Sequence, residues 1–147
     1  MTELNFSNIF GETNREYVFI GKGKISIKYV EKELISESGG TRLITKDKRG
    51  HYIPASWVLM VQYFTPETKI EFEKQLSDVD RKDISVEKKR EYIFSEGNVL
   101  VINEPISIYV DSNGAHEILT DDSLITILPE WIKISWEPKP NEPTFVI

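Results

Sequence analysis

The sequence contains no cysteine, which excludes a disulfide framework, a thiolate zinc site, an iron–sulfur cluster and a cysteine nucleophile. It also lacks long hydrophobic runs. The longest, Trp57-Val58-Leu59-Met60-Val61, suits a buried strand and is far shorter than the roughly 18 apolar residues that a membrane helix needs. The first residues have neither the basic start nor the apolar stretch of a signal peptide. We therefore expect a soluble, cytoplasmic protein, either of a bacterium or of a phage-infected host cell.

Histidine is scarce too, because only His51 and His116 are present and no second histidine stands at metal-ligand spacing from either. No Gly-x-Ser-x-Gly nucleophile motif occurs, and no phosphate-binding Gly-x-x-x-x-Gly-Lys-Ser/Thr loop. Gly21-Lys22-Gly23-Lys24 is glycine-rich and basic, but the residues after it alternate as in a strand, so no helix N-terminus supports anion binding there. We predict no metal and no cofactor. We favour a protein without catalytic activity and leave open an enzyme whose acidic site is assembled by the fold.

The chain has 147 residues, of which 39% are hydrophobic and 11% aromatic, values typical of one globular domain over residues 1–147. The formal net charge of −6 is unevenly distributed, because residues 104–147 contain two Lys/Arg against eight Asp/Glu. Such an acidic end disfavours binding to nucleic acid and suits a partner with a basic surface. A solvated acidic face without a partner is the alternative.

Apolar and polar residues alternate with a period of two along most of the chain, which is typical of half-buried strands. The alternation is clear over 24–29, and Glu37-Ser38-Gly39-Gly40 predicts the turn of a hairpin. We predict a mainly β fold, with an α+β fold left open, as an antiparallel sandwich or barrel of about 8–10 short strands. The other predicted strands are 33–36, 41–46, 56–64, 98–103, 105–110, 115–119, 123–128 and 131–136.

Three segments depart from this pattern. Residues 66–76 carry both helix and strand signals, and 77–92 are dense in charge, with Ser85 as a candidate cap of a short helix. The proline-rich residues 137–147 are expected to form an extended tail. Residues 42–56 and 107–121 both read as strand, glycine-containing turn and strand, which we interpret as common hairpins rather than an internal repeat.

One cluster combines cations with aromatic rings, as sites for nucleotides or other anionic small molecules do. A basic hairpin tip with its aromatic side chains in the core is the alternative interpretation. The candidate ligand-binding residues are Arg42, Lys46, Lys48, Arg49, His51, Tyr52 and Trp57.

The acidic C-terminal third contains the candidates for contact with a partner protein, which are Asp121, Asp122, Glu130, Trp136, Glu137 and Phe145. Our leading hypothesis is a non-catalytic inhibitor, immunity or anti-defence protein, encoded by a phage or mobile element, that binds another protein. The alternative is a protein that binds or sequesters an anionic small molecule. Whether the chain forms a homo-oligomer, or has a structural role in a virion, is left open.

Residues 111–131 contain a turn glycine, then Leu119-Thr120-Asp121-Asp122, a leucine and a late tryptophan, where Trp131-Ile132-Lys133 nearly fits a Trp-x-Ile pattern. This segment is loosely similar to the end of small phage proteins that sequester cyclic-nucleotide immune signals. The similarity covers about a seventh of the chain, and the N-terminal Gly-Trp-Asn-Gly signature of those proteins is absent. The resemblance implies a nucleotide ligand and so supports the small-molecule alternative.

Overall fold

The computed structural model describes residues 5–76 and 80–140, and the chain divides into two units, residues 1–77 (unit 1) and 78–147 (unit 2). Both units consist of antiparallel strands, and the described residues contain one short α-helix, which confirms the predicted mainly β class. In neither unit do the described strands close into a barrel. A single domain over residues 1–147 stays a prediction.

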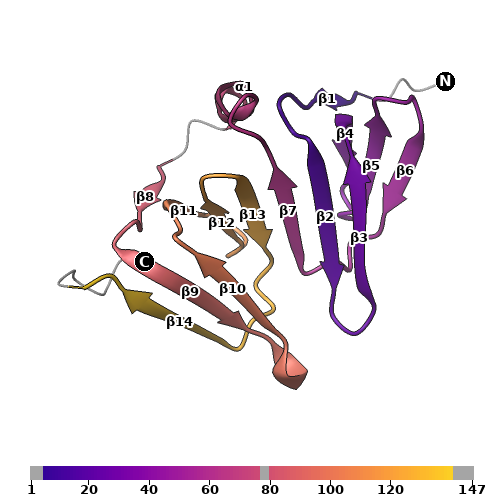
Figure 1. The fold of residues 1–147 in the computed structure, drawn as a ribbon. Helices are drawn as coiled ribbons and strands as arrows, with labels where there is room; N and C mark the ends of the chain where they lie inside the picture. The colour runs from indigo at the N-terminus through magenta and orange to yellow at the C-terminus, as the bar shows by residue number, and fades with distance from the viewer. Residues whose placement is uncertain (1–4, 77–79, 141–147) are drawn as a thin grey trace. The chain divides into compact units, whose positions relative to one another are not determined.

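Unit 1 contains two sets of strands (Figure 1). In the first, β2 (Asn14–Phe19) pairs with both β3 (Gly23–Lys28) and β7 (Leu59–Tyr63). The second has the order β1 (Ser7–Asn8), β4 (Val30–Ile35), β5 (Thr41–Thr45), β6 (Gly50–Ile53).

The two sets of unit 1 are joined by a sharp bend, because only Tyr29, with a positive φ of 55°, separates β3 from β4. The apolar core of this unit draws residues from both sets, namely Tyr17, Ile27, Val30, Leu43 and Ile53.

The helix α1 (Lys69–Lys74) follows β7 and settles the mixed signals of residues 66–76 in favour of a helix. Its buried side chain, Phe72, stacks on Phe64 at a ring-centroid distance of 4.9 Å. The apparent alternation of Ile70 and Phe72 with charged residues was misleading, because Ile70 is exposed and Phe72 is the buried side chain of the helix.

Unit 2 repeats this arrangement (Figure 1). Here β9 (Glu87–Ile93) pairs with both β10 (Val99–Asn103) and β14 (Lys133–Pro138), and a 3₁₀ turn (Ser95–Gly97) joins β9 to β10. The other strands of the unit have the order β8 (Lys82–Asp83), β11 (Ser107–Val110), β12 (His116–Leu119), β13 (Ser123–Ile127).

Each described strand of unit 2 has a counterpart in unit 1, β8 to β14 corresponding in order to β1 to β7. Within each unit, corresponding strands pair with corresponding neighbours. The bend is repeated at Glu104, whose φ of 50° matches that of Tyr29. The hydrogen bond from Val58 N–H to Val18 C=O is also matched, by one from Ile132 to Ile93, both 2.8 Å long. We conclude that the two units are two copies of one module.

The interpretation of residues 42–56 and 107–121 as ordinary hairpins is therefore incomplete. A repeat is present, but in another register, because residues 42–56 contain β5 and β6 and the counterparts of these strands are β12 and β13. Up to the turn after β5, each residue of unit 1 and its counterpart in unit 2 lie 75 positions apart in the sequence, as Tyr29 and Glu104 do. After that turn the separation is 74, as for Val58 and Ile132, because the corresponding turn of unit 2, which follows β12, is one residue shorter.

Two expectations for the charged and proline-rich segments change. The short helix expected after Ser85 is wrong, because residues 87–93 form β9, a strand that turns Glu87, Arg90 and Tyr92 inward. Of the proline-rich residues 137–147, the first two belong to β14, and Pro138 closes its pairing with β9 where a bulge shifts the register. Residues 141–147 lie outside the described residues.

Candidate functional site

A buried charge network lies inside unit 1. The guanidinium of Arg15 is fully buried; it donates to Glu12 Oε1 over 2.8 Å, to Tyr17 Oη over 3.0 Å, and also to Glu33. Gln62 donates to Glu12 as well, over 2.8 Å. Burial opposes the charge of Arg15, but the attraction of the two glutamates outweighs it and holds the pKa of Arg15 above its ordinary value. Burial also raises the pKa of Glu12, against the attraction of Arg15.

Unit 2 contains the same network at the counterpart positions. The fully buried Arg90 donates to Glu87 over 2.6 Å and 2.8 Å and to Tyr92 Oη over 3.3 Å. Sequence reasoning missed this network, although a signal was present. Residues 12–19 read Glu-Thr-Asn-Arg-Glu-Tyr-Val-Phe and residues 87–94 read Glu-Lys-Lys-Arg-Glu-Tyr-Ile-Phe, identical at five of eight positions.

A tryptophan completes each network. Trp57 meets Tyr17 edge to face at 5.6 Å, and its counterpart Trp131 meets Tyr92 in the same way at 5.2 Å. Trp57 therefore packs on the core of unit 1, as the alternative interpretation of the basic cluster expected, and the two networks are structural features of the module rather than candidate sites.

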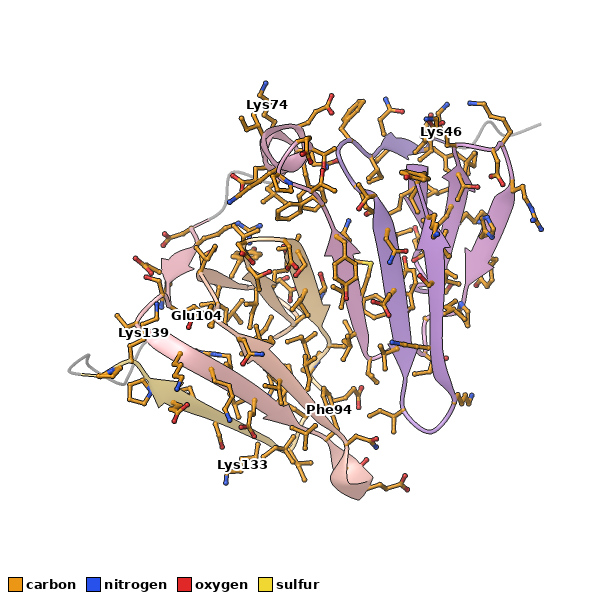
Figure 2. All side chains as sticks on the ribbon, viewed as in Figure 1. Lys46, Lys74, Phe94, Glu104, Lys133 and Lys139 are labelled. Atoms are coloured by element: carbon orange, nitrogen blue, oxygen red, sulfur yellow. The ribbon has the colours of Figure 1, made fainter. Side chains whose placement is uncertain are left out.

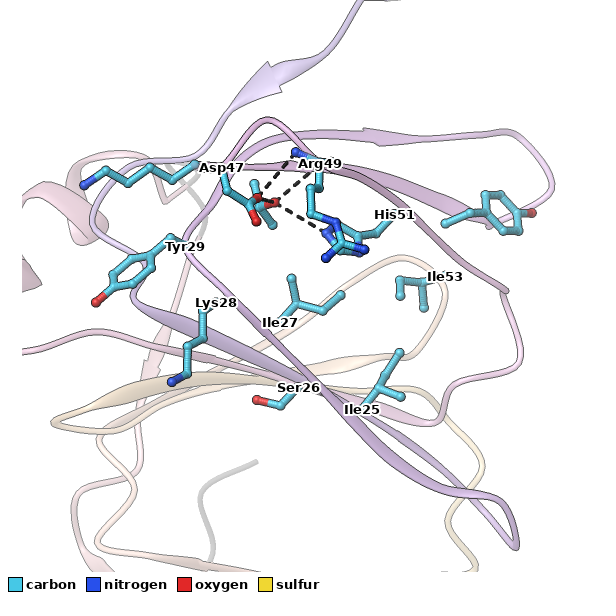
Figure 3. Close-up of a pocket in the computed structure, with 12 residues that line it drawn as sticks. Ile25, Ser26, Ile27, Lys28, Tyr29, Asp47, Arg49, His51 and Ile53 are labelled. Atoms are coloured by element: carbon cyan, nitrogen blue, oxygen red, sulfur yellow. Dashed lines mark hydrogen bonds between the residues drawn. The ribbon is translucent and has the colours of Figure 1, made fainter.

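The candidate site is a cleft in unit 1 with a volume of about 700 Å³ (Figure 3). Its apolar part consists of Ile25, Ile27 and Ile53, of which the last two are buried. The remaining lining residues are Ser26, Lys28, Tyr29, Thr45, Lys46, Asp47, Arg49, His51 and Tyr52.

The cleft is electropositive. Lys28, Lys46 and Arg49 are exposed, and within residues 5–76 and 80–140 none of them forms a salt bridge. Lys46 Nζ lies 5.8 Å from the centre of the Tyr29 ring, a cation–π contact that leaves the ammonium free to bind an anion.

The single carboxylate of the lining, Asp47, is engaged locally. Thr45 Oγ1 donates a hydrogen bond to it, which is the main reason why its pKa lies below the ordinary value, and the backbone N–H of Arg49 donates over 3.4 Å (Figure 3). His51 Nε2 lies 3.4 Å from the same hydroxyl. Asp47 therefore orders the turn and attracts Arg49 without forming a salt bridge, so that Lys46 and Arg49 remain available to a ligand.

The structure brings together four of the seven predicted ligand-binding residues, which are Lys46, Arg49, His51 and Tyr52. Alternation along β6 places the Tyr52 ring on the face opposite to His51, where it lies 5.9 Å from the guanidinium carbon of Arg42. Lys48 does not line the cleft and reaches Glu31 at 3.4 Å.

The other eight lining residues were missed by sequence reasoning, among them Lys28 and Tyr29. Lys28 ends β3 and Tyr29 follows it, and only the pairing of β4 with β5 brings the bend at Tyr29 beside Lys46. The local signal was the strand pattern 24–29, which carries no information on its distant neighbours.

In unit 2 the positions that match the cleft have lost its positive charge. Asp121 stands where unit 1 has Lys46, and the buried Ser123 where it has Arg49. Tyr29 is matched by Glu104, whose carboxylate pairs with Lys139 over 3.1 Å (Figure 2). Two of the acidic candidates, Asp121 and Asp122, thus lie in the counterpart of the turn that contains Lys46, Lys48 and Arg49.

The described partner-binding candidates lie in the turn between β12 and β13, in the loop before β14 and on β14 itself. Asp121, Asp122, Glu130 and Glu137 are exposed. Trp136 is half-buried on β14, with its ring 5.4 Å from the guanidinium of Arg90. Phe145 lies outside the described residues.

Comparison with known proteins finds no matching family model, no matching curated protein and no matching solved structure. Among residues 5–76 and 80–140, no three His, Asp or Glu side chains are grouped so that they could hold a metal ion. The helices of this part of the chain are also too short to cross a membrane. The site must therefore be interpreted from its own geometry.

Proposed function

We propose that this chain is a non-catalytic binding protein and that the cleft of unit 1 captures an anionic group of its ligand. The observation that carries the proposal is the combination of two exposed cations, Lys46 and Arg49, with an apolar floor of isoleucines in a cleft of about 700 Å³, and Lys28 adds positive charge from the other face of β3. This volume lies within the range typical of ligand sites, which are mostly apolar with a few oriented polar groups.

The energetics favour an anion. A hydrogen bond from a lysine or arginine to a carboxylate or phosphate contributes about 1.5–3 kcal/mol, roughly twice a neutral one. The guanidinium of Arg49 can bind such a group through two parallel hydrogen bonds, whereas Lys46 acts as a point charge. Within the described residues neither Lys46 nor Arg49 forms a salt bridge, although the charge of Asp47 attracts Arg49, so a ligand does not have to displace an internal ion pair.

The test is an NMR titration of the full chain with inorganic phosphate, adenosine monophosphate and glutarate at low salt. We expect the backbone signals of Lys28, Lys46 and Arg49 to shift together. The double variant Lys46→Ala/Arg49→Ala should weaken binding at least tenfold.

Lys48→Ala is the matched control, because this lysine lies in the same turn but points to Glu31 rather than into the cleft. It should bind as the wild type does. Equal losses in Lys48→Ala and in the double variant would show a general charge effect and would refute the assignment of the cleft.

A second candidate function is contact with a basic partner protein, which the distribution of charge between the units favours. Residues 78–147 contain seven Lys/Arg against fourteen Asp/Glu, a net of −7, whereas residues 1–77 contain eleven against ten, a net of +1. Asp121→Lys/Asp122→Lys reverses the exposed acidic turn of unit 2. If unit 2 binds a basic partner, a protein captured from lysate by the wild type should be lost from this variant and retained by Lys46→Ala/Arg49→Ala.

A further inference from the structure

The cleft of unit 1 is bordered by two strand edges. Within the described residues, β3 and β6 each stand last in the order of their strands. Both contribute to the lining, β3 through residues 25–28 and β6 through residues 51–53. An edge strand presents unpaired backbone N–H and C=O groups, which form a template for another extended chain.

The hydrogen-bond pattern of β6 identifies these groups. Thr45 N–H donates to Arg49 C=O over 3.0 Å, which makes this pair a hydrogen-bonded one. Since such pairs alternate along antiparallel strands, residues 51 and 53 bond to β5 while the backbone of Gly50 and Tyr52 faces away from it. Within the described residues, no other backbone hydrogen bond engages Gly50 or Tyr52.

The second module shows that this strand position can be covered. In β13, the counterpart of β6, four of the five residues are buried, whereas in β6 only Ile53 is. Leu124 is 4% exposed, and its counterpart in unit 1 is the exposed Gly50. The strand position that is buried in unit 2, as β13, is therefore exposed to solvent in unit 1, as β6.

We propose that the cleft binds an extended, acidic segment of a partner protein, which adds as a strand along the free edge of β6. The proposal rests on the anion-binding function of the cleft and names the class of its ligand. Main-chain hydrogen bonds to Gly50 and Tyr52 supply a general affinity for an extended chain.

Side chains of the segment supply the specificity. Because they alternate along a strand, every second one meets the apolar floor of Ile25, Ile27 and Ile53, and carboxylates at the rim meet Lys46 and Arg49. The four residues of β6 match a segment of about four residues, or roughly 13 Å at the usual rise. A small anion would use the cations but would leave the backbone edge unused.

The test is selection of a phage-displayed library of random linear heptapeptides on the immobilised full chain. We expect enrichment of sequences that alternate Asp or Glu with apolar residues. Their affinity should fall at least tenfold with Lys46→Ala/Arg49→Ala and at least tenfold with Tyr52→Pro, which removes the outward N–H without touching the pairing of β5 with β6.

Tyr52→Ala is the matched comparison, because it also removes the ring but keeps the N–H, so its loss of affinity should be clearly smaller than that of Tyr52→Pro. Unchanged melting temperatures of the three variants verify their folding. Hydrogen exchange at the amide of Tyr52 should slow at least tenfold when an enriched peptide is bound, a readout in the wild-type chain that needs no variant.

The outcomes separate this proposal from the one on which it rests. Strand addition would be overturned, and anion capture preserved, if small anions bind in the cleft but the library yields no enrichment. The same conclusion would follow if the enriched peptides bind equally well to Tyr52→Pro and leave the hydrogen exchange of the Tyr52 amide unchanged. Loss of both responses would overturn both proposals.

Discussion

Acid should destabilise unit 2 through His116. This histidine lies on β12, is only 5% exposed, and its Nδ1 stands 2.6 Å from Tyr92 Oη. Its ring centre also lies 4.5 Å from that of Trp131. Burial, helped by the nearby positive charge of Arg90, lowers the pKa of His116 to about 4. A protonated imidazole has no acceptor nitrogen, so Tyr92 could no longer donate its hydroxyl proton to Nδ1, and the new positive charge would be buried near Arg90.

The size of the effect follows from proton linkage. In the unfolded chain histidine titrates near its ordinary pKa of about 6.5, so between that pH and 4 the unfolded state binds more protons than the folded state. The contribution of His116 is therefore complete above pH 6.5 and is lost as the pH falls toward 4. With the pKa of about 4, the free energy of unfolding decreases by about 2 kcal/mol from pH 7 to pH 5.

The assay is urea unfolding followed by tryptophan fluorescence in a Trp57→Phe background, so that both remaining tryptophans, Trp131 and Trp136, report on unit 2. His116→Asn, which keeps a hydrogen-bond acceptor near Tyr92, should remove about 2 kcal/mol of the change between pH 7 and pH 5. Equal pH dependence with and without this substitution would refute the reasoning. So would an NMR titration, in a His51→Ala chain, that finds the pKa of His116 near 6.5.

Two further predictions concern unit 1. Glu12→Gln/Glu33→Gln removes both carboxylates from the buried Arg15 and should lower the free energy of unfolding, measured by urea unfolding, by about 3–5 kcal/mol. Either single substitution leaves one carboxylate and should lower it clearly less. A double variant no less stable than the single variants would contradict the shared role of the two carboxylates. Gly11→Ala would place a Cβ 2.6 Å from the backbone nitrogen of Phe72, at a residue whose own φ is +77°. We expect the free energy of unfolding to fall by about 1–3 kcal/mol in the same assay. An unchanged unfolding midpoint would show that α1 can move away from the new methyl group.

The sequence predicted the β class because most strands place apolar residues inward. The turns at 37–40, 46–50 and 111–114 also carry residues that favour them. It did not predict β2 or β9, since the side chains that these strands bury include Arg15, Glu87 and Arg90, and a pattern based on hydrophobicity assigns such residues to the surface. Here charge is buried because it is paired, a condition that only the three-dimensional neighbours can satisfy.

The candidate site was predicted in part, for a similar reason. Lys46, Arg49 and His51 are close in sequence and also line one cleft, so local composition identified them. Arg42 and Tyr52 were grouped with these residues, although period-two alternation already places Tyr52 opposite His51. The contribution of Lys28 and Tyr29 depended on the bend between β3 and β4, which local composition does not reveal.

The duplication shows which features of the module have been retained and which have diverged. Both copies keep the inward Glu–Arg–Tyr network and its tryptophan, although the inner partners differ: Glu33 in unit 1 is matched by the apolar Ile108 in unit 2. Truncating a buried ion pair on one side is costly, so the network can change only by coordinated substitutions.

The exposed turn after β5 is free of that constraint, and there the two copies carry opposite charge, Lys46 against Asp121. If the module alone determined binding, both copies would bind the same ligands. Because the charge differs at this exposed position, we expect the two units to have different ligands. Replacing Asp121 and Ser123 of unit 2 by Lys and Arg should not by itself create an anion site. The reason is that the open cleft of unit 1 also depends on the exposed strand β6, whereas β13 is buried.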